Sequence, residues 1–402
     1  MNNISLEDFF RAYFDCRQNK RNSLSALEFE IDFEKKLMEL EREVNDGNYK
    51  ISPSNVFITS RPVKREIFAA QFRDRVIHHL IVNKLNEFFE KEFIYDSYSC
   101  RKDKGTLFGI KRIEHFIRSC SNNYQKDCWI LKIDIRGYFM SINKDILIEK
   151  LVNFIDKKYK KSDKERIIWL CSKIINNDST ENCILKSPYY KWKDLPKSKS
   201  LFHSSSRCGL PIGNYTSQIF ANFYLNFFDH FVKNRLNIKY YGRYVDDAVF
   251  ILENKGDLRF IMPKIKKFLE EELELKIHPR KIYFQHYSKG VEFLGSFIKP
   301  WRVYVSKRVK GNFWRKLKYL NNHLLDKDLN KEKKEHIVSV VNSYLGILSH
   351  LKTYKLRRKF LDCFNNNFWN YFKIGDRKIP WGQSPKIRRW EPTSGAVSEA
   401  KN

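Results

Sequence analysis

The chain has 402 residues and carries 76 Lys and Arg against 47 Asp and Glu, a formal net charge of +29. An excess of this size favours a polyanionic partner such as nucleic acid over a generic solvated surface, although charge alone does not separate an enzyme from a binding protein. No run of 18 apolar residues occurs, which argues against a membrane span, and the 8 cysteines form no Cys-x-x-Cys pair that would indicate zinc.

The first part of the chain is predicted to be helical and then to change character. Residues 1–55 have the mixed charge of exposed helices and lack a signal-peptide pattern, so we expect a cytoplasmic protein with reduced thiols. Residues 56–125 predict strands followed by a long amphipathic helix from Arg75 to Glu92.

The segment Trp129–Ile135 predicts a strand that carries Asp134. Alternation places Leu131, Ile133 and Ile135 on one face, and Lys132 and Asp134 on the other. Aspartate is unfavourable in a strand, so its position there calls for a functional reason.

An insertion at about 162–207 is dense in Lys, Ser and Asn, and its end predicts a surface loop. The run Gly209–Gln218 follows, and then aromatic residues at helical spacing, which are expected to be core.

Two short β-forming runs flank Tyr244–Asp247 and predict a hairpin with Asp246 and Asp247 at its tip. Adjacent carboxylates repel each other, and a divalent cation would remove that cost; a plain polar turn is the alternative. Asp134 on a neighbouring strand favours the metal hypothesis. Three such acids suit two metals roughly 3.5–4 Å apart, as used for phosphoryl displacement.

The C-terminal part divides in two. Residues 301–373 predict helices with basic faces, and residues 374–402 have three prolines and few aliphatics, so we expect that tail to be poorly ordered.

Several segments, in order along residues 45–360, resemble the motifs of reverse transcriptases. Leu131–Ile142 resembles motif A, Gly209–Gln218 motif B, and Tyr244–Asp247 motif C. Downstream, Leu275–Lys281 is similar to motif D and Glu292–Gly295 to motif E. An ordered series of this kind is far more specific than one motif.

This resemblance implies an α/β (α+β) right-hand polymerase. After an N-terminal extension (1–55) it would have fingers (56–125), a palm of antiparallel sheet backed by helices (126–300), and a helical thumb (301–373). The implied partners are template RNA, primer or cDNA, and dNTPs, with two Mg²⁺ ions, or Mn²⁺, as cofactor.

The resemblance also implies roles for single residues. Asp134, Asp246, Asp247 and the Ile135 carbonyl would hold the metals, and Lys281 would protonate the leaving pyrophosphate, with a solvated turn lysine as the alternative. Lys64 and Arg65 would bind the β- and γ-phosphates of the incoming nucleotide. The alternative is that they form a structural salt bridge.

Phe139 stands where the family carries an aromatic gate against the ribose 2′-hydroxyl, although a core ring is the alternative. Gly213 would let the backbone approach substrate closely. Motif B departs from its usual form because Ile212 replaces a Gln and Gln218 replaces a Pro. Loss of that polar side chain suggests lower fidelity.

The Ile212 and Gln218 variant resembles the reverse transcriptases of diversity-generating retroelements, which implies cDNA synthesis there, with a small basic accessory protein as partner. Alternatives are a reverse transcriptase of antiphage defence, with a second defence protein, or a non-catalytic RNA-binding descendant, which three intact acids argue against. The sequence leaves the template, primer, working metal and oligomeric state open.

Overall fold

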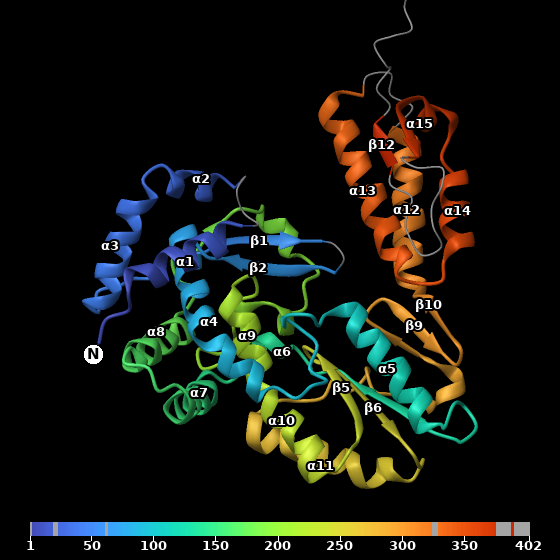
Figure 1. Cartoon of the computed structure of the whole chain (residues 1–402), viewed down its shortest axis with the longest axis horizontal. Helices are drawn as coiled ribbons and strands as arrows, with labels where there is room; N and C mark the ends of the chain where they lie inside the picture. Colours follow the sequence, from blue (N-terminus) through green and yellow to red (C-terminus); the bar gives the residue numbers. More distant parts are fainter. Residues whose placement is uncertain (1, 19–22, 61–62, 324–328, 375–386, 390–402) are drawn as a thin grey trace, which may run out of the picture. The chain divides into compact units, whose positions relative to one another are not determined.

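The computed structural model describes residues 2–18, 23–60, 63–323, 329–374 and 387–389 (Figure 1). It divides into two compact units. The first comprises Met1–Gly109 and Trp129–Phe284, and the second Ile110–Cys128 and Gln285–Asn402. The expected palm, 126–300, therefore contributes to both units, since residues after Phe284 belong to the second.

A four-stranded sheet lies at the centre of the first unit. Its order is β5-β6-β3-β7, and β6 runs antiparallel to both β5 and β3. The strands are β3 (Trp129–Ile133), β5 (Tyr240–Tyr244), β6 (Asp247–Leu252) and β7 (Tyr283–His286).

Burial along β3 explains how the sheet aims its polar side chains. Leu131, Ile133 and Ile135 are buried in the main core, whereas Lys132 and Asp134 are partly exposed. The predicted alternation is thus confirmed, except that Asp134 directly follows β3 instead of lying within it.

Helices back this sheet and share its core, as expected for a palm. Phe220 and Phe223 of α9 and Leu269 of α11 belong to the same buried cluster as Leu131 and Ile133. These helices are α6 (Tyr138–Ser141), α7 (Lys144–Lys158), α8 (Lys164–Asn176), α9 (Tyr215–Tyr224), α10 (Asn226–His230) and α11 (Asp257–Leu273).

Three N-terminal helices pack on the long helix α4 (Phe72–Glu92): α1 (Leu6–Arg17), α2 (Leu24–Glu30) and α3 (Phe33–Asn45). The ammonium of Lys84 in α4 lies 2.5 Å from Asp8 in α1 and 2.8 Å from Asp163 before α8. One partly buried lysine therefore connects helix α1 to the body of the unit.

A small second sheet joins distant parts of the chain. Hairpin β1 (Asn55–Thr59) and β2 (Arg65–Ala69) is antiparallel, and β4 (Ile184–Leu185) adds to β1 in parallel. Since β4 belongs to the insertion, the segment 162–207 is not one loop. It contains α8, β4 and three 3₁₀ turns, η1 (Tyr189–Trp192), η2 (Lys197–Lys199) and η3 (Leu201–His203).

The second unit has a three-stranded antiparallel sheet of β8 (Val291–Phe293), β9 (Ser296–Lys299) and β10 (Arg302–Val305). Four helices follow, α12 (Lys307–His323), α13 (Lys331–Ser349), α14 (Tyr354–Asp362) and α15 (Asn366–Tyr371), around a core that includes Phe313, Val341 and Phe360. Helix α5 (Thr106–Cys120) begins in the first unit and continues into the second.

Most of the expected tail, 374–402, lies outside the described residues. Within it, β12 (Ile387–Arg389) pairs with β11 (Phe372–Ile374), and Asn342 of α13 exchanges hydrogen bonds with the Ile387 backbone. Across the described ranges, each helix is too short or too polar to cross a bilayer.

Candidate active site

The acidic hairpin forms as predicted and brings its carboxylates to one end of the sheet. Tyr244 pairs with Asp247, which leaves Val245 and Asp246 as the two turn residues between β5 and β6. On the other side of β6, Ile133 pairs with Ala248. The next residue outward on each strand is Asp134 and Asp247, so all three acids gather at this end.

The charges of these acids are only partly balanced. Burial, together with the nearby carboxylates of Asp134 and Asp247, raises the pKa of Asp246 to about 7, against a small opposing effect of Lys281. The other two acids each have an ammonium partner: Lys281 at 2.8 Å from Asp134, and Lys132 at 3.2 Å from Asp247.

Lys281 reaches Asp134 because the chain around it is fixed on the end of β3. Ile135 forms a bridge with Ile277, and the backbone N–H of His278 donates to the Asp134 carbonyl at 2.8 Å. The Lys281 N–H then donates to the His278 carbonyl at 3.0 Å, which closes a tight turn. The motif D segment and the first acid thus form one structural element.

The acidic hairpin is stabilised by a buried ion pair that the sequence did not predict. The Arg243 guanidinium donates hydrogen bonds to both carboxylate oxygens of Asp229. The same carboxylate also accepts a hydrogen bond from the Tyr241 hydroxyl at 2.6 Å. A further Arg243 nitrogen donates to the Val245 carbonyl at 2.7 Å. The presence of an arginine in the short β-forming run before the acids was the feature of the sequence that could have indicated this ion pair.

The hydrogen bond from Arg243 to the Val245 carbonyl stabilises an unfavourable backbone conformation at Val245. Val245 has φ of 54°, a left-handed conformation that β-branched residues rarely adopt. Such strain persists only where the surroundings impose it, and it is frequent at functional sites. The arginine therefore helps to set the direction in which Asp246 points.

The motif B segment packs against strand β2. The Ile212 carbonyl accepts from the Phe68 N–H at 2.8 Å, and Gly213 has φ of 129° with the Phe68 carbonyl 2.9 Å from where a Cβ would lie. Gly213 is thus needed for close approach to β2. Gln218 is exposed on α9 and accepts from the Cys100 thiol at 3.1 Å.

Two polar side chains at the start of α9 form hydrogen bonds outside that helix. The Asn214 amide oxygen accepts from the Ala70 N–H at 3.1 Å, and the Thr216 hydroxyl lies 2.7 Å from Nδ1 of His78. Burial lowers the pKa of His78 to about 3, so this imidazole is neutral and belongs to the core.

Phe139 and Ile212 come together although 73 residues separate them in the sequence. Both are partly buried and pack against one small cluster, made of Val56, Phe68, Met140 and Leu201. Phe139 also contacts the main core. The ring is therefore partly a core side chain, while part of its surface remains exposed.

Lys64 and Arg65 lie at the start of β2. The Lys64 ammonium donates to the Lys193 carbonyl in the insertion, and Arg65 is exposed and pairs across the hairpin with Thr59. Among the described residues, no hydrogen bond or ion pair joins either of them to the three acids. The structural salt bridge considered for Lys64 is replaced by a backbone carbonyl contact.

The acids fit a divalent metal by their chemistry. Among the described residues, no group of three His, Cys, Asp or Glu side chains is close enough together to bind one metal ion. Carboxylate oxygens are nevertheless the ligands that Mg²⁺ and Mn²⁺ prefer, and a cation beside Asp246 would relieve the repulsion that raises its pKa.

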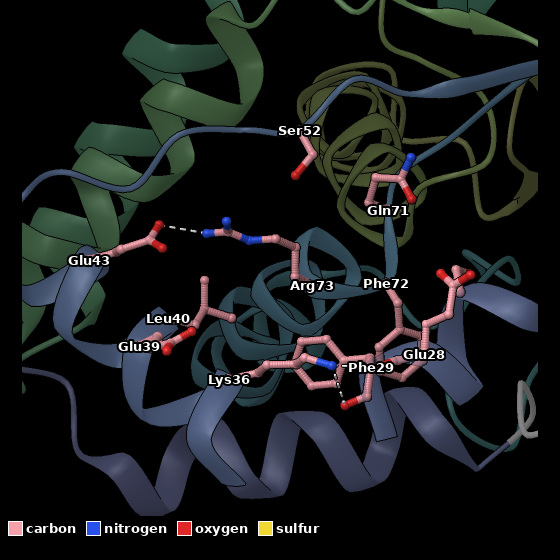
Figure 2. A pocket seen from close by; sticks show the side chains of 11 residues that line it. Glu28, Phe29, Lys36, Glu39, Leu40, Glu43, Ser52, Gln71, Phe72 and Arg73 are labelled. Carbon is pink, nitrogen blue, oxygen red and sulfur yellow. Dashed lines mark hydrogen bonds and ion pairs between the residues drawn. The ribbon is translucent and has the colours of Figure 1, made fainter. Parts of the chain in front are cut away.

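A separate pocket of about 370 Å³ lies among the N-terminal helices and contains none of the predicted site residues. Figure 2 shows Arg73 and Glu43 pointing toward each other there, joined by an ion pair of 2.5 Å. Lys36 donates to the Glu28 carbonyl at the same pocket. These contacts connect α2, α3 and α4, so the pocket is a gap between packed helices.

The family model for "Reverse transcriptase (RNA-dependent DNA polymerase)" matches residues 63–298, more than half of the chain. The chain therefore belongs to the reverse transcriptase family, and its fold is that of a right-hand polymerase.

Two curated relatives and one solved structure illustrate this likeness. The chain is 23% identical over 309 residues to the putative COX1/OXI3 intron 2 protein of Saccharomyces cerevisiae, covering 68% of this chain and 35% of that protein. It is 22% identical over 293 residues to protein YkfC of Escherichia coli, covering 64% and 69%. The apo telomerase structure from Candida tropicalis superposes with a TM-score of 0.46 at 14% identity, covering 77% of this chain and 59% of that one. The chain spans about a third of the yeast protein.

Proposed function

We propose that this protein is an RNA-directed DNA polymerase that copies a template RNA into cDNA. The observation that carries the proposal is the gathering of Asp134, Asp246 and Asp247 at one end of the palm sheet, in a chain of the reverse transcriptase family. Phosphoryl transfer asks the protein mainly for positioning and charge, which such a cluster supplies.

In this proposal the three carboxylates and the Ile135 carbonyl hold two Mg²⁺ or Mn²⁺ ions. Bound there, the metals supply Lewis-acid activation of the primer 3′-hydroxyl and hold the triphosphate. Asp246 and Asp134 would be the main ligands, with Asp247 assisting, and the raised pKa of Asp246, about 7, shows that this carboxylate would gain from a nearby cation.

The remaining residues bind and orient the substrates. Lys281 gives a proton to the leaving pyrophosphate, and Lys64 and Arg65 bind the β- and γ-phosphates. Phe139 excludes the 2′-hydroxyl of a ribonucleotide. Gly213 and the exposed Gln218 bring motif B to the incoming nucleotide or the template.

The biological role we propose is cDNA synthesis in a diversity-generating retroelement. Its support is the resemblance of motif B, in which Ile212 and Gln218 replace a Gln and a Pro, together with the packing of Ile212 against the same small apolar cluster that Phe139 contacts. An apolar contact discriminates poorly between bases, which suits a mutagenic enzyme. A small basic accessory protein would then be a partner.

The second candidate role is antiphage defence, with a second defence protein as partner. It is favoured by the insertion, whose strand β4 pairs with β1. Neither role changes the proposed chemistry.

One experiment tests both levels. Purified protein is given a primed RNA template, dNTPs and Mg²⁺ or Mn²⁺, and the cDNA that copurifies with the protein is sequenced. Extension that requires Asp246 supports the polymerase. Copies of one repeat-associated RNA with frequent errors support diversification, whereas accurate cDNA of another origin favours defence. Absence of extension with either metal would contradict the enzyme assignment.

A further inference from the structure

The end of the insertion presents an unusual combination of exposed side chains. We call residues 186–201 the lysine arm. It contains five exposed lysines and one aspartate, and across the described residues no carboxylate forms an ion pair with any of those lysines. The lysines are Lys186, Lys191, Lys193, Lys197 and Lys199. Tyr189 and Tyr190 are 82% and 72% exposed.

The backbone of the lysine arm is nevertheless fixed. Glu66 of β2 is fully buried and accepts three hydrogen bonds from the arm: from Trp192 Nε1 at 2.7 Å, from the Ser200 hydroxyl at 2.8 Å, and from the Leu201 N–H at 2.6 Å. A buried carboxylate is costly unless satisfied in this way, so releasing the arm would leave an unpaired charge. These three hydrogen bonds therefore hold the arm against strand β2.

The anchored Trp192 faces a second ring. Tyr189–Trp192 forms the 3₁₀ turn η1, and side chains at i and i+3 of a 3₁₀ helix eclipse each other. The Tyr189 and Trp192 rings accordingly lie nearly parallel, 21° apart in orientation, with their centroids 6.5 Å apart. The exposed Tyr189 ring thus lies beside an indole that the hydrogen bond to Glu66 holds in place.

We propose that the exposed Tyr189 ring stacks on one unpaired base of the template RNA, while lysines of the arm contact the neighbouring phosphates. Aromatic rings beside a basic track are how proteins bind single strands without reading sequence. Intramolecular packing does not explain Tyr189, because most of its surface is in solvent. The choice of template RNA as occupant rests on the proposed function and on the positive charge of the arm.

The test measures binding of the full-length protein to a fluorescent single-stranded RNA and to the same RNA annealed to its complement. A length of about 20 nucleotides exceeds the roughly 4–16 nucleotides that one single-strand-binding fold covers. Tyr189→Ala should weaken single-strand binding roughly 5- to 150-fold, the effect of losing one base–aromatic stack. Duplex binding should change little, because the faces of paired bases are covered by their neighbours in the stack and are not available to the Tyr189 ring. Tyr189→Phe keeps the ring and should bind as wild type.

Phe260→Ala is the matched control. Phe260 is a 73% exposed aromatic residue on α11 of the same unit, outside the arm, and its removal should leave RNA binding unchanged. Equal binding by wild type and Tyr189→Ala, or equal weakening for single strand and duplex, would overturn the proposal. Thermal midpoints of all variants confirm that the fold is intact.

A second measurement addresses the lysines. For Lys197→Gln and Lys199→Gln together, the slope of log affinity against log salt should fall by up to about 0.7 per lost phosphate contact on a single strand. An unchanged slope would contradict phosphate contact by the arm. Binding needs no catalysis, and primer extension by the wild-type protein is recorded on the same preparation. Failure of the base-stacking inference is thereby distinguished from failure of the polymerase assignment.

Discussion

The Lys281 ammonium donates to both carboxylate oxygens of Asp134, each at 2.8 Å. The proposed proton donor thus lies directly on a proposed metal ligand. Its side chain is 48% exposed, and exposed ion pairs contribute little to stability, so the lysine can be replaced without unfolding the protein.

Lys281→Met is expected to slow nucleotide addition by about 10²- to 10⁴-fold, the usual contribution of a general acid, with an unchanged thermal midpoint. Single-turnover rates across pH measure this effect. Lys281→Arg keeps the positive charge but does not release its proton near neutral pH. If the arginine variant restores the full rate, Lys281 acts by charge and not by proton transfer.

Asp246→Asn and Asp134→Asn should each abolish dNTP incorporation while leaving RNA binding near normal, because each removes a negative metal ligand. Loss of such a ligand costs several kcal/mol of transition-state stabilisation. Primer extension and RNA affinity are measured side by side. Glu271→Gln, which removes a carboxylate from an exposed helical pair with Lys267, is the control and should be fully active. Near wild-type extension by Asp246→Asn would refute the site.

Phe139→Ala should increase ribonucleotide incorporation relative to deoxyribonucleotide. Since the ring is only partly buried, we expect a stability cost below the roughly 3–5 kcal/mol typical of fully buried phenylalanine. Met140→Ala is the matched control: Met140 is buried in the same small cluster, so its loss should cost stability without changing sugar selection. Sugar preference unchanged in both variants would make Phe139 a core residue only.

Ile212→Gln is expected to lower the error rate, because it restores a polar group where related enzymes have one. A pocket change of this size supplies about 1–3 kcal/mol of discrimination. Sequencing cDNA made by both proteins on one RNA tests this, with template adenine as the position where errors should be most frequent. Equal and low error rates would favour defence over diversification.

The buried His78 predicts a specific loss of stability in acid. Its pKa is about 3 in the folded protein against 6.5 for an ordinary exposed histidine, so the unfolded chain binds a proton between these values and the folded chain does not. The stability is therefore complete above pH 6.5 and decreases as pH falls. The variant His78→Gln lacks the imidazole and therefore lacks this difference in proton binding between the folded and unfolded chain. The wild type should lose about 2 kcal/mol more than the variant between about pH 7.5 and 5 in denaturant unfolding. Parallel pH curves would contradict the assignment.

The sequence predicted the hairpin, the strand before Asp134 and the fold class, because these follow from local alternation and from ordered motifs. It did not predict the ion pair of Arg243 with Asp229, nor the left-handed Val245, since both depend on contacts between residues distant in the chain. The end of the insertion, residues 194–200 of the lysine arm, was predicted as a surface loop, and its anchoring was missed for the same reason. Its composition is that of a loop, and only the buried Glu66, 126 positions before Trp192, fixes it in place.

The Arg243 guanidinium has a consequence for exchanging catalytic parts between relatives. Besides Asp229, it donates to the Asn222 side chain at 3.1 Å, while the Arg243 backbone hydrogen-bonds with residues 96 and 98. A chimera that receives only a foreign acidic hairpin would change the residue at the Arg243 position, but it would keep the Asp229 and Asn222 of the host chain. The buried ion pair and its hydrogen bond could then be lost. The smallest transferable module therefore comprises three separate stretches of sequence, 96–98, 222–229 and 240–252.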